Sequence, residues 1–324
     1  MRSALRLAVP AAVLAAVLAV TAGCATGTAQ RPEAGPRPPD AQAAGPALPP
    51  GPALPPEPAL TPAELRTLDR AEQVLIGRCL RAQQFAYVET VPDARPVRRF
   101  PYVIDDIAWA RSHRYGLELE RRAAARKDAD PNARYFRSLP PERQKAALAA
   151  LNGGRPVGLS VRMPAGGVAS ASDDGCTAAA QRRLYGDLPG WFAARLVVAN
   201  LSPLYVPKVR EDRRFRQAEA AWADCMAARG HRFAGPHALR RDLPGLLRGL
   251  SADRARAAEV RLAVAEAGCA RDSGLARTAA ALDEQYGSEV RARYGTQIAT
   301  RLRLQRAALP RARQILAGAV LPSA

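Results

Sequence analysis

The feature that constrains the fold most is the set of four cysteines after residue 60 of this 324-residue chain: Cys79, Cys176, Cys225 and Cys269. No two of them form a Cys-x-x-Cys pair and no paired histidines accompany them, so the sequence does not predict a zinc site. An even number of cysteines in an exported chain predicts disulfides, and four cysteines allow three connectivities. Whether these cysteines are oxidised therefore depends on whether the chain is exported.

The N-terminus has the three parts of a secretory signal. Arg2 and Arg6 precede an apolar run over residues 7–20, and the small residues 21–23 follow it. The run is shorter than the ~20 apolar residues that a membrane-spanning helix needs. We therefore expect residues 1–23 to be a signal peptide that is removed from the mature protein.

The end of this signal resembles the lipobox of bacterial lipoproteins, carried here by Ala22, Gly23 and Cys24. In that family the cysteine thiol takes a diacylglyceryl group and the cysteine becomes the new N-terminus. Thr21 departs from the pattern, because the family prefers Leu, Val or Ile at this position, and ordinary cleavage further on, for example after Ala29, is the alternative. The resemblance implies a lipid on Cys24 that anchors the protein to the outer face of the cell membrane.

A spacer follows the expected lipid site. Residues 24–61 are rich in Pro, Ala and Gly, and the hexapeptide Gly-Pro-Ala-Leu-Pro-Pro starts at residue 45 and again at residue 51. Such a segment buries too little apolar surface to fold and prefers an extended polyproline II conformation. We expect it to be disordered and to hold the following domain away from the membrane. Its Pro-x-x-Pro spacing also resembles ligands of aromatic-lined domains, but the spacer interpretation suits an exported protein better.

An internal similarity predicts how the cysteines pair. The segments that begin at Cys79 and Cys225 both read as helix ends that run into an aromatic residue, and Cys176 and Cys269 each precede a Tyr-Gly pair. We interpret this as a duplicated unit in which each copy contains one disulfide. The predicted pairs are Cys79–Cys176 and Cys225–Cys269.

Helix signals occur along the rest of the chain. Thr61 and Glu64 form a capping-box sequence that starts a predicted helix over residues 62–84. Apolar residues at helical spacing also predict a long helix that starts at Leu275 and ends before Pro310.

The composition agrees with a helical domain. Aromatic residues make up only 5% of the chain and alanine is abundant, which favours packed helices over sheets. Residues 157–161 are compatible with one strand of a small β-hairpin. We predict a mainly α domain, residues 62–324, that consists of two related disulfide-stapled units at about 62–187 and 188–324.

The motif Trp-x-x-Cys-Met-x-x-x-Gly at residues 222–230 resembles the signature of a group of actinobacterial secreted lipoproteins with two disulfides and no assigned activity. Residues 106–116 and 175–180 are similar to two further hallmarks of that group. The resemblance covers most of the mature domain. It implies export, a lipid anchor and disulfides, and it implies no reaction.

The charge indicates which partners to consider. The formal net charge is +18, almost all of it from arginine, and no acidic residue follows Glu289. Seven arginines follow Glu289, but at helical spacing they scatter around the helix axis instead of forming one stripe: Arg291, Arg293, Arg301, Arg303, Arg306, Arg311 and Arg313. The expected partners are the membrane through the lipid, and an envelope protein or an anionic wall polymer. Export argues against nucleic acid.

The sequence contains no nucleophile elbow, paired-histidine metal motif or phosphate loop. We therefore expect no catalytic, cofactor-binding or metal-binding residues. Asp105 and Asp106 are the candidates for a catalytic acid pair, although a helix-cap role explains one of them. Trp109, Trp191 and Trp222 are candidates to line a groove for a wall glycan or peptide, and Trp222 fits better as core next to Cys225.

The predicted function is a non-enzymatic binding or accessory module in the cell envelope. The alternative is a wall-modifying hydrolase that uses scattered carboxylates. A third interpretation, a purely structural spacer, predicts that no ligand changes the melting temperature.

Mass spectrometry of the protein from its native membrane tests the anchor. We expect the N-terminal peptide to begin at Cys24 and to carry a diacylglyceryl mass, which a Cys24→Ser variant loses because a hydroxyl forms no thioether. An N-terminus beyond Cys24 without a lipid would contradict the prediction.

Overall fold

The computed structural model describes residues 59–90, 98–155 and 157–320. All of them belong to the unit Glu57–Ala324, which is mainly helical, as predicted. The expected signal peptide, Cys24 and all but the last residues of the spacer lie outside the described residues. Among the described helices, none has the length and hydrophobicity that a membrane-spanning segment requires.

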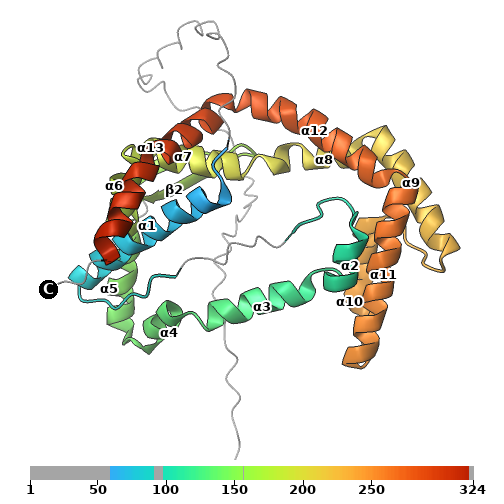
Figure 1. Ribbon diagram of the computed structural model, residues 1–324, viewed down its shortest axis with the longest axis horizontal. Helices are drawn as coiled ribbons and strands as arrows, with labels where there is room; N and C mark the ends of the chain where they lie inside the picture. The colour runs from blue at the N-terminus through green and yellow to red at the C-terminus, as the bar shows by residue number, and fades with distance from the viewer. Residues whose placement is uncertain (1–58, 91–97, 156, 321–324) are drawn as a thin grey trace, which may run out of the picture. The chain divides into compact units, whose positions relative to one another are not determined.

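The elements up to residue 200 are α1 (Pro62–Ala82), α2 (Ile107–His113), α3 (Leu117–Asp128), α4 (Pro131–Ser138), α5 (Pro141–Asn152), β1 (Gly158–Arg162), β2 (Val168–Ser172), α6 (Gly175–Tyr185) and α7 (Leu188–Ala199). The later elements are the 3₁₀ turn η1 (Ser202–Leu204), α8 (Val206–Glu211), α9 (Arg213–Ala228), α10 (Pro236–Leu246), α11 (Ala252–Asp272), α12 (Leu275–Arg293) and α13 (Gly295–Val320). Figure 1 shows their arrangement.

The predicted start of α1 is confirmed. The Thr61 hydroxyl accepts the Glu64 N–H at 3.2 Å and the Glu64 carboxylate accepts the Thr61 N–H at 2.8 Å, which completes the capping box. The helix ends at Ala82, two residues before the predicted end, because Gln84 adopts a left-handed conformation with φ of 61°. That reversal places Phe85 in the core.

Aspartates begin many of the other helices. At the starts of α2, α4, α6, α7 and α9, an aspartate carboxylate accepts a hydrogen bond from one or two backbone N–H groups of the helix. These aspartates are Asp106, Asp130, Asp174, Asp187 and Asp212 respectively. Each carboxylate satisfies donors that have no partner inside the helix and lies near the positive end of the helix dipole. Much of the acidic sequence therefore defines where helices begin.

The predicted long helix from Leu275 is wrong in two respects. It is divided at Tyr294 into α12 and α13, and α13 continues through Pro310 to Val320. A proline inside a helix removes one backbone hydrogen bond. Here Ala308, Leu309 and their neighbours in α13 are buried against other helices, and this packing maintains the helix around Pro310.

The predicted β-hairpin is present. β1 and β2 pair antiparallel, with Gly158 opposite Ser172 and Arg162 opposite Val168. Leu159 on β1 is buried in a small cluster that includes Leu188 and other residues of α6 and α7. The hairpin thus covers one side of these two helices.

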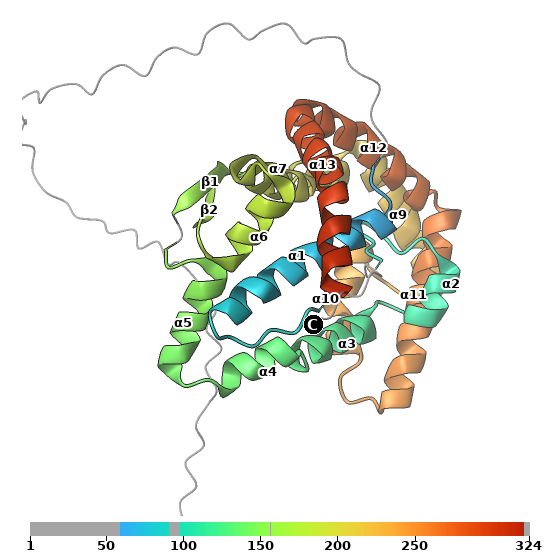
Figure 2. The same ribbon diagram turned by 60° about the vertical axis from the view of Figure 1, so that its left-hand side comes forward.

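One hydrophobic core lies between α1, α6, α7 and α13. α1 packs most extensively against α13 and then against α6, and α13 also packs against α7 (Figures 1 and 2). Buried residues between 304 and 315 of the last helix therefore lie in the same cluster as buried residues between 68 and 80 of the first. The hydrophobic clusters do not follow a division of the chain at residue 187.

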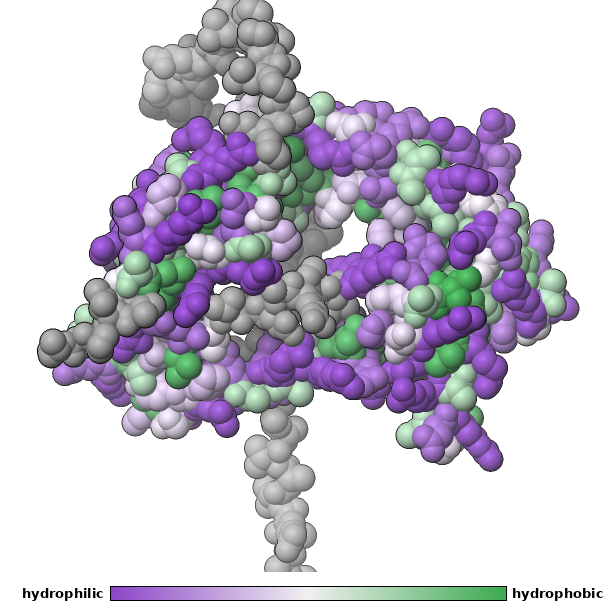
Figure 3. Space-filling view, viewed as in Figure 1, coloured by the Kyte–Doolittle hydropathy of each residue, from purple (hydrophilic) through white to green (hydrophobic). Residues whose placement is uncertain are grey.

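A second core is formed mainly by α9, α11 and α12 with contributions from α8 and α10. Trp222, Met226 and Leu239 are among its fully buried side chains. The face seen in Figure 3 is mostly hydrophilic, and its hydrophobic residues form small separate groups. Burial is thus divided among several clusters of modest size, as an alanine-rich and aromatic-poor composition dictates.

Candidate ligand-binding site

The structure joins the same two cysteine pairs that the sequence analysis expects. Cys79 bonds to Cys176 and Cys225 bonds to Cys269, with Cα–Cα distances of 5.6 and 5.7 Å. Cys79 and Cys225 each lie three residues before the last residue of their helix, whereas Cys176 is the second residue of α6 and Cys269 lies near the end of α11. The two disulfides are thus alike in the position of the first cysteine on its helix and differ in the position of the second. Disulfides of this kind are typical of an oxidising, extracytoplasmic compartment.

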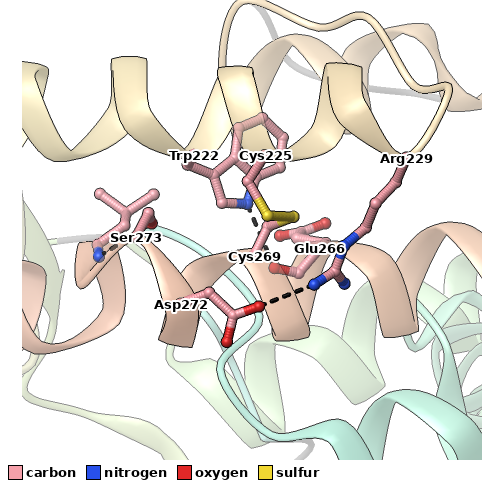
Figure 4. Close-up of a disulfide and its surroundings, with 8 residues drawn as sticks. Trp222, Cys225, Arg229, Glu266, Cys269, Asp272 and Ser273 are labelled. Atoms are coloured by element: carbon pink, nitrogen blue, oxygen red, sulfur yellow. Dashed lines mark hydrogen bonds and ion pairs between the residues drawn. A yellow bond between two sulfur atoms is a disulfide. The ribbon is translucent and has the colours of Figure 1, made fainter.

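Trp222 belongs to the core beside the second disulfide, as the sequence analysis favours. Its side chain is 0% exposed and its indole N–H donates to the backbone carbonyl of Glu266 at 3.2 Å (Figure 4). At the edge of the same region Arg229 pairs with Asp272 at 2.8 Å. Trp222 therefore does not line a groove.

A buried carboxylate ties three chain segments together nearby. Glu266 Oε1 on α11 accepts hydrogen bonds from the Ile104 N–H and from Arg240 on α10, both at 2.9 Å. Arg240 also donates to the Phe100 carbonyl at 2.7 Å. Burial raises the pKa of Glu266, and the Arg240 guanidinium opposes this shift. The charges of this cluster are paired with each other, which indicates a structural role.

Asp106 acts as a helix cap. Its carboxylate accepts the Trp109 N–H at 2.9 Å and pairs with Arg98, and these contacts hold the pKa of Asp106 below its usual value. Asp105 lies 3.4 Å from the same arginine. A general acid at neutral pH needs a raised pKa, so the contacts of Asp106 suit a helix cap better than a general acid.

The remaining two tryptophans line hollows in the structure. Trp109 packs edge-on against Phe100 at 4.7 Å and borders a broad depression of about 1010 Å³. Trp191 borders a smaller cavity of about 350 Å³ between α1, α6, α7 and α13. The polar lining of this smaller cavity makes it the stronger candidate for a binding site, and we call it the Trp191 cavity.

Each of the four helices presents to the Trp191 cavity residues that recur at helical spacing. The lining residues are Leu65, Leu68, Asp69, Glu72 and Gln73 of α1, Gln181 and Tyr185 of α6, Trp191 and Arg195 of α7, and Arg301 and Gln305 of α13. Residues three or four positions apart lie on one face of a helix, so one face of each helix forms one wall.

An aromatic pair forms the best-packed part of the lining. The rings of Tyr185 and Trp191 stack with centroids 3.7 Å apart, and the two residues are 3% and 4% exposed. The indole N–H of Trp191 is buried and has no hydrogen-bond partner among the described residues. A buried donor without an acceptor costs about 1–3 kcal/mol.

Two carboxylates lie on the α1 wall. Glu72 accepts a hydrogen bond from Gln181 at 2.9 Å and another from the Tyr185 hydroxyl at 3.4 Å. Burial raises the pKa of Glu72, and the neighbouring charge of Asp69 adds to this, while Gln181 and Arg195 oppose it. Burial also raises the pKa of Asp69. Glu72 is partly buried and lacks some of the solvation that a carboxylate favours, whereas the Asp69 side chain is exposed at the rim of the cavity.

Two guanidinium groups lie on the other walls. Arg195 Nε and Arg301 Nε are buried, and neither has a hydrogen-bond acceptor among the described residues. No ion pair within the described part of the chain joins either arginine to Asp69 or Glu72. The cavity therefore presents two positive and two negative groups that do not neutralise each other by direct contact.

The sequence analysis identified part of this site. Trp191 is one of the candidate groove residues, and Arg301 is one of the seven C-terminal arginines that the sequence analysis interprets as scattered around the helix axis. Asp69, Glu72 and Arg195 were missed. In the sequence, these charged residues lie three to four positions from buried apolar residues. The solvated edge of an ordinary amphipathic helix shows the same pattern, so the pattern does not identify a site.

Comparison with known proteins adds no assignment. No family model matches the chain, and no curated protein and no solved structure matches it. The functional inference therefore depends on the geometry of the Trp191 cavity.

A Glu72→Gln variant tests the solvation of this carboxylate through the pH dependence of stability. The pKa of Glu72 is higher in the folded protein than in the unfolded chain, where it is about 4.3. Protonated Glu72 therefore contributes fully to the stability of wild type below pH ~4.3, and this contribution is lost as pH rises through the folded pKa. The variant lacks this loss, so its melting temperature should fall less than that of wild type between about pH 4 and pH 7.

Calorimetry of both proteins across this range makes the measurement. Glu142→Gln is the control, because Glu142 is an exposed carboxylate on α5. Parallel curves for wild type and Glu72→Gln would show that Glu72 is solvated in the folded protein.

Proposed function

We propose that this chain is a lipid-anchored cell-envelope protein outside the cytoplasmic membrane, and that it binds a small polar ligand in the Trp191 cavity without acting as an enzyme. The lipobox-like segment at Cys24 and the spacer support the anchored location, and the two disulfides are compatible with it. The resemblance to secreted actinobacterial lipoproteins points in the same direction. In this proposal the membrane is the partner of the lipid, and the ligand comes from the envelope.

The observation that carries the binding proposal is the set of unpaired charges at the Trp191 cavity. Glu72, Arg195 and Arg301 are partly buried and Asp69 is exposed at the rim, and no ion pair among the described residues joins the two signs, although buried charges in proteins are normally paired. A volume of about 350 Å³ lies at the small end of the usual range for small-molecule sites. Polar groups held apart in this way favour binding over a purely structural role.

A wall-modifying hydrolase is the second candidate, because two carboxylates with raised pKa values face one cavity. Glycoside hydrolysis needs carboxylates on both sides of the scissile bond, ~5–9.5 Å apart. Asp69 and Glu72 are three residues apart on one helix face and therefore lie on the same wall. Their arrangement favours binding over hydrolysis.

Thermal unfolding with a panel of amino acids, short peptides, amino sugars and small organic acids tests the proposed function. At least one compound should raise the melting temperature of wild type, since a ligand at ~100 times its Kd stabilises by about 2.7 kcal/mol. An Arg195→Met variant should lose most of this shift. The matched control Arg303→Met should keep it, because Arg303 is exposed on α13, outside the cavity lining.

Two results would contradict the proposal. A panel that leaves the melting temperature unchanged would favour the structural spacer. Release of fragments from purified peptidoglycan by wild type, and not by Asp69→Asn, would favour the hydrolase.

A further inference from the structure

We infer that the ligand of the Trp191 cavity is a small zwitterion, an amino acid or a dipeptide, whose carboxylate lies against Arg195 and Arg301 and whose ammonium group lies against Asp69 and Glu72. This inference rests on the proposed binding function and specifies its ligand. It follows from the balance of charge, the positions of the charges, the unpartnered donors and the size of the cavity.

The positive and negative side chains that line the Trp191 cavity are equal in number. Two carboxylates and two guanidinium groups are its only charged members. A ligand of one sign would leave the opposite pair of charges without compensation in a poorly solvated site. A ligand that carries one group of each sign compensates both.

The charges are separated by helix. Both carboxylates are on α1, whereas the guanidinium groups are on α7 and α13. Like charges that share a wall repel each other and gain from a counter-ion placed between them. The arrangement thus provides a cation subsite on α1 and an anion subsite on α7 and α13.

Three donors without an acceptor belong to residues that line the anion subsite. Trp191 Nε1, Arg195 Nε and Arg301 Nε are all buried without an acceptor among the described residues. Trp191 itself is 4% exposed, so solvent does not compensate its N–H. A carboxylate has two oxygens with about four acceptor positions and forms its strongest hydrogen bonds with guanidinium donors.

The cation subsite has acceptors to spare. Glu72 already accepts from Gln181 and Tyr185, and these bonds orient it. Asp69 forms no hydrogen bond with another described residue. An ammonium group has three donors and no acceptor, which suits a wall of two carboxylates. Burial raises the pKa of both carboxylates, and a ligand cation would reverse part of that effect.

Size and aromatic packing select among polar ligands. A cavity of about 350 Å³ lies at the small end of the ~300–1,000 Å³ range of small-molecule sites, which suits an amino acid or a dipeptide of small residues. A sugar ring usually needs a free aromatic face. Tyr185 and Trp191 stack on each other and are almost fully buried, so their faces are occupied.

Calorimetric titration of the purified mature domain with alanyl-alanine, in its L,L and D,D forms, and with free alanine tests the inference. At least one of these zwitterions should bind. Its N-acetyl derivative, which lacks the ammonium group, and its C-terminal amide, which lacks the carboxylate, should each bind at least tenfold more weakly. A capped derivative that binds as tightly as its parent would overturn the inference.

Variants assign each end of the ligand to its subsite. Asp69→Asn should reduce the preference for the free amine over the N-acetyl form, and Arg195→Met should reduce the preference for the acid over the amide. Arg303→Met should change neither preference. Each variant must unfold cooperatively near the wild-type temperature, and the ratio between parent and capped ligand remains measurable even if overall affinity falls.

The outcomes separate this inference from the proposed function. If no alanine zwitterion binds but another polar compound does, the zwitterion inference fails and the binding function stands. If no compound in either experiment binds, both fail.

Discussion

The disulfide between Cys79 and Cys176 is the constraint on which the rest of the structure depends most. It joins the end of α1 to the start of α6 across a sequence separation of 97 residues, and chain-entropy estimates assign such a loop up to about 4.7 kcal/mol. The chain has only 5% aromatic residues, so its helices bury little surface per residue and gain much from a covalent link. Two of the four walls of the Trp191 cavity are thereby held together.

The same packing explains how the fold supports a destabilising site. Charges that face a poorly hydrated cavity without direct partners reduce the free energy of unfolding. The buried cluster of α1, α6, α7 and α13 surrounds this cavity and offsets the loss, with Leu68, Leu184 and Leu304 among its members. The cluster of Glu266 and Arg240 contrasts with this arrangement, because its two charges are in direct contact at 2.9 Å. We therefore interpret the separated charges of the first core as a binding site and the paired charges of the second core as structural.

Local chemistry made much of the fold predictable. The capping box at Thr61, the hairpin and the core position of Trp222 follow from short patterns, and the disulfide pairs follow from a repeated one. The Trp191 cavity was not predictable, because Glu72 and Arg301 meet there only after α13 packs against α1, more than 200 residues earlier in the chain. Such long-range packing leaves no periodic signal. Continuation of α13 through Pro310 was missed for the same reason.

Urea unfolding of a Cys79→Ala/Cys176→Ala variant tests most directly whether this disulfide holds the four-helix core together. The account predicts that the free energy of unfolding falls by about 2–5 kcal/mol relative to wild type. An unfolding midpoint and slope equal to those of wild type would contradict it, because non-covalent packing alone would then hold α1 against α6.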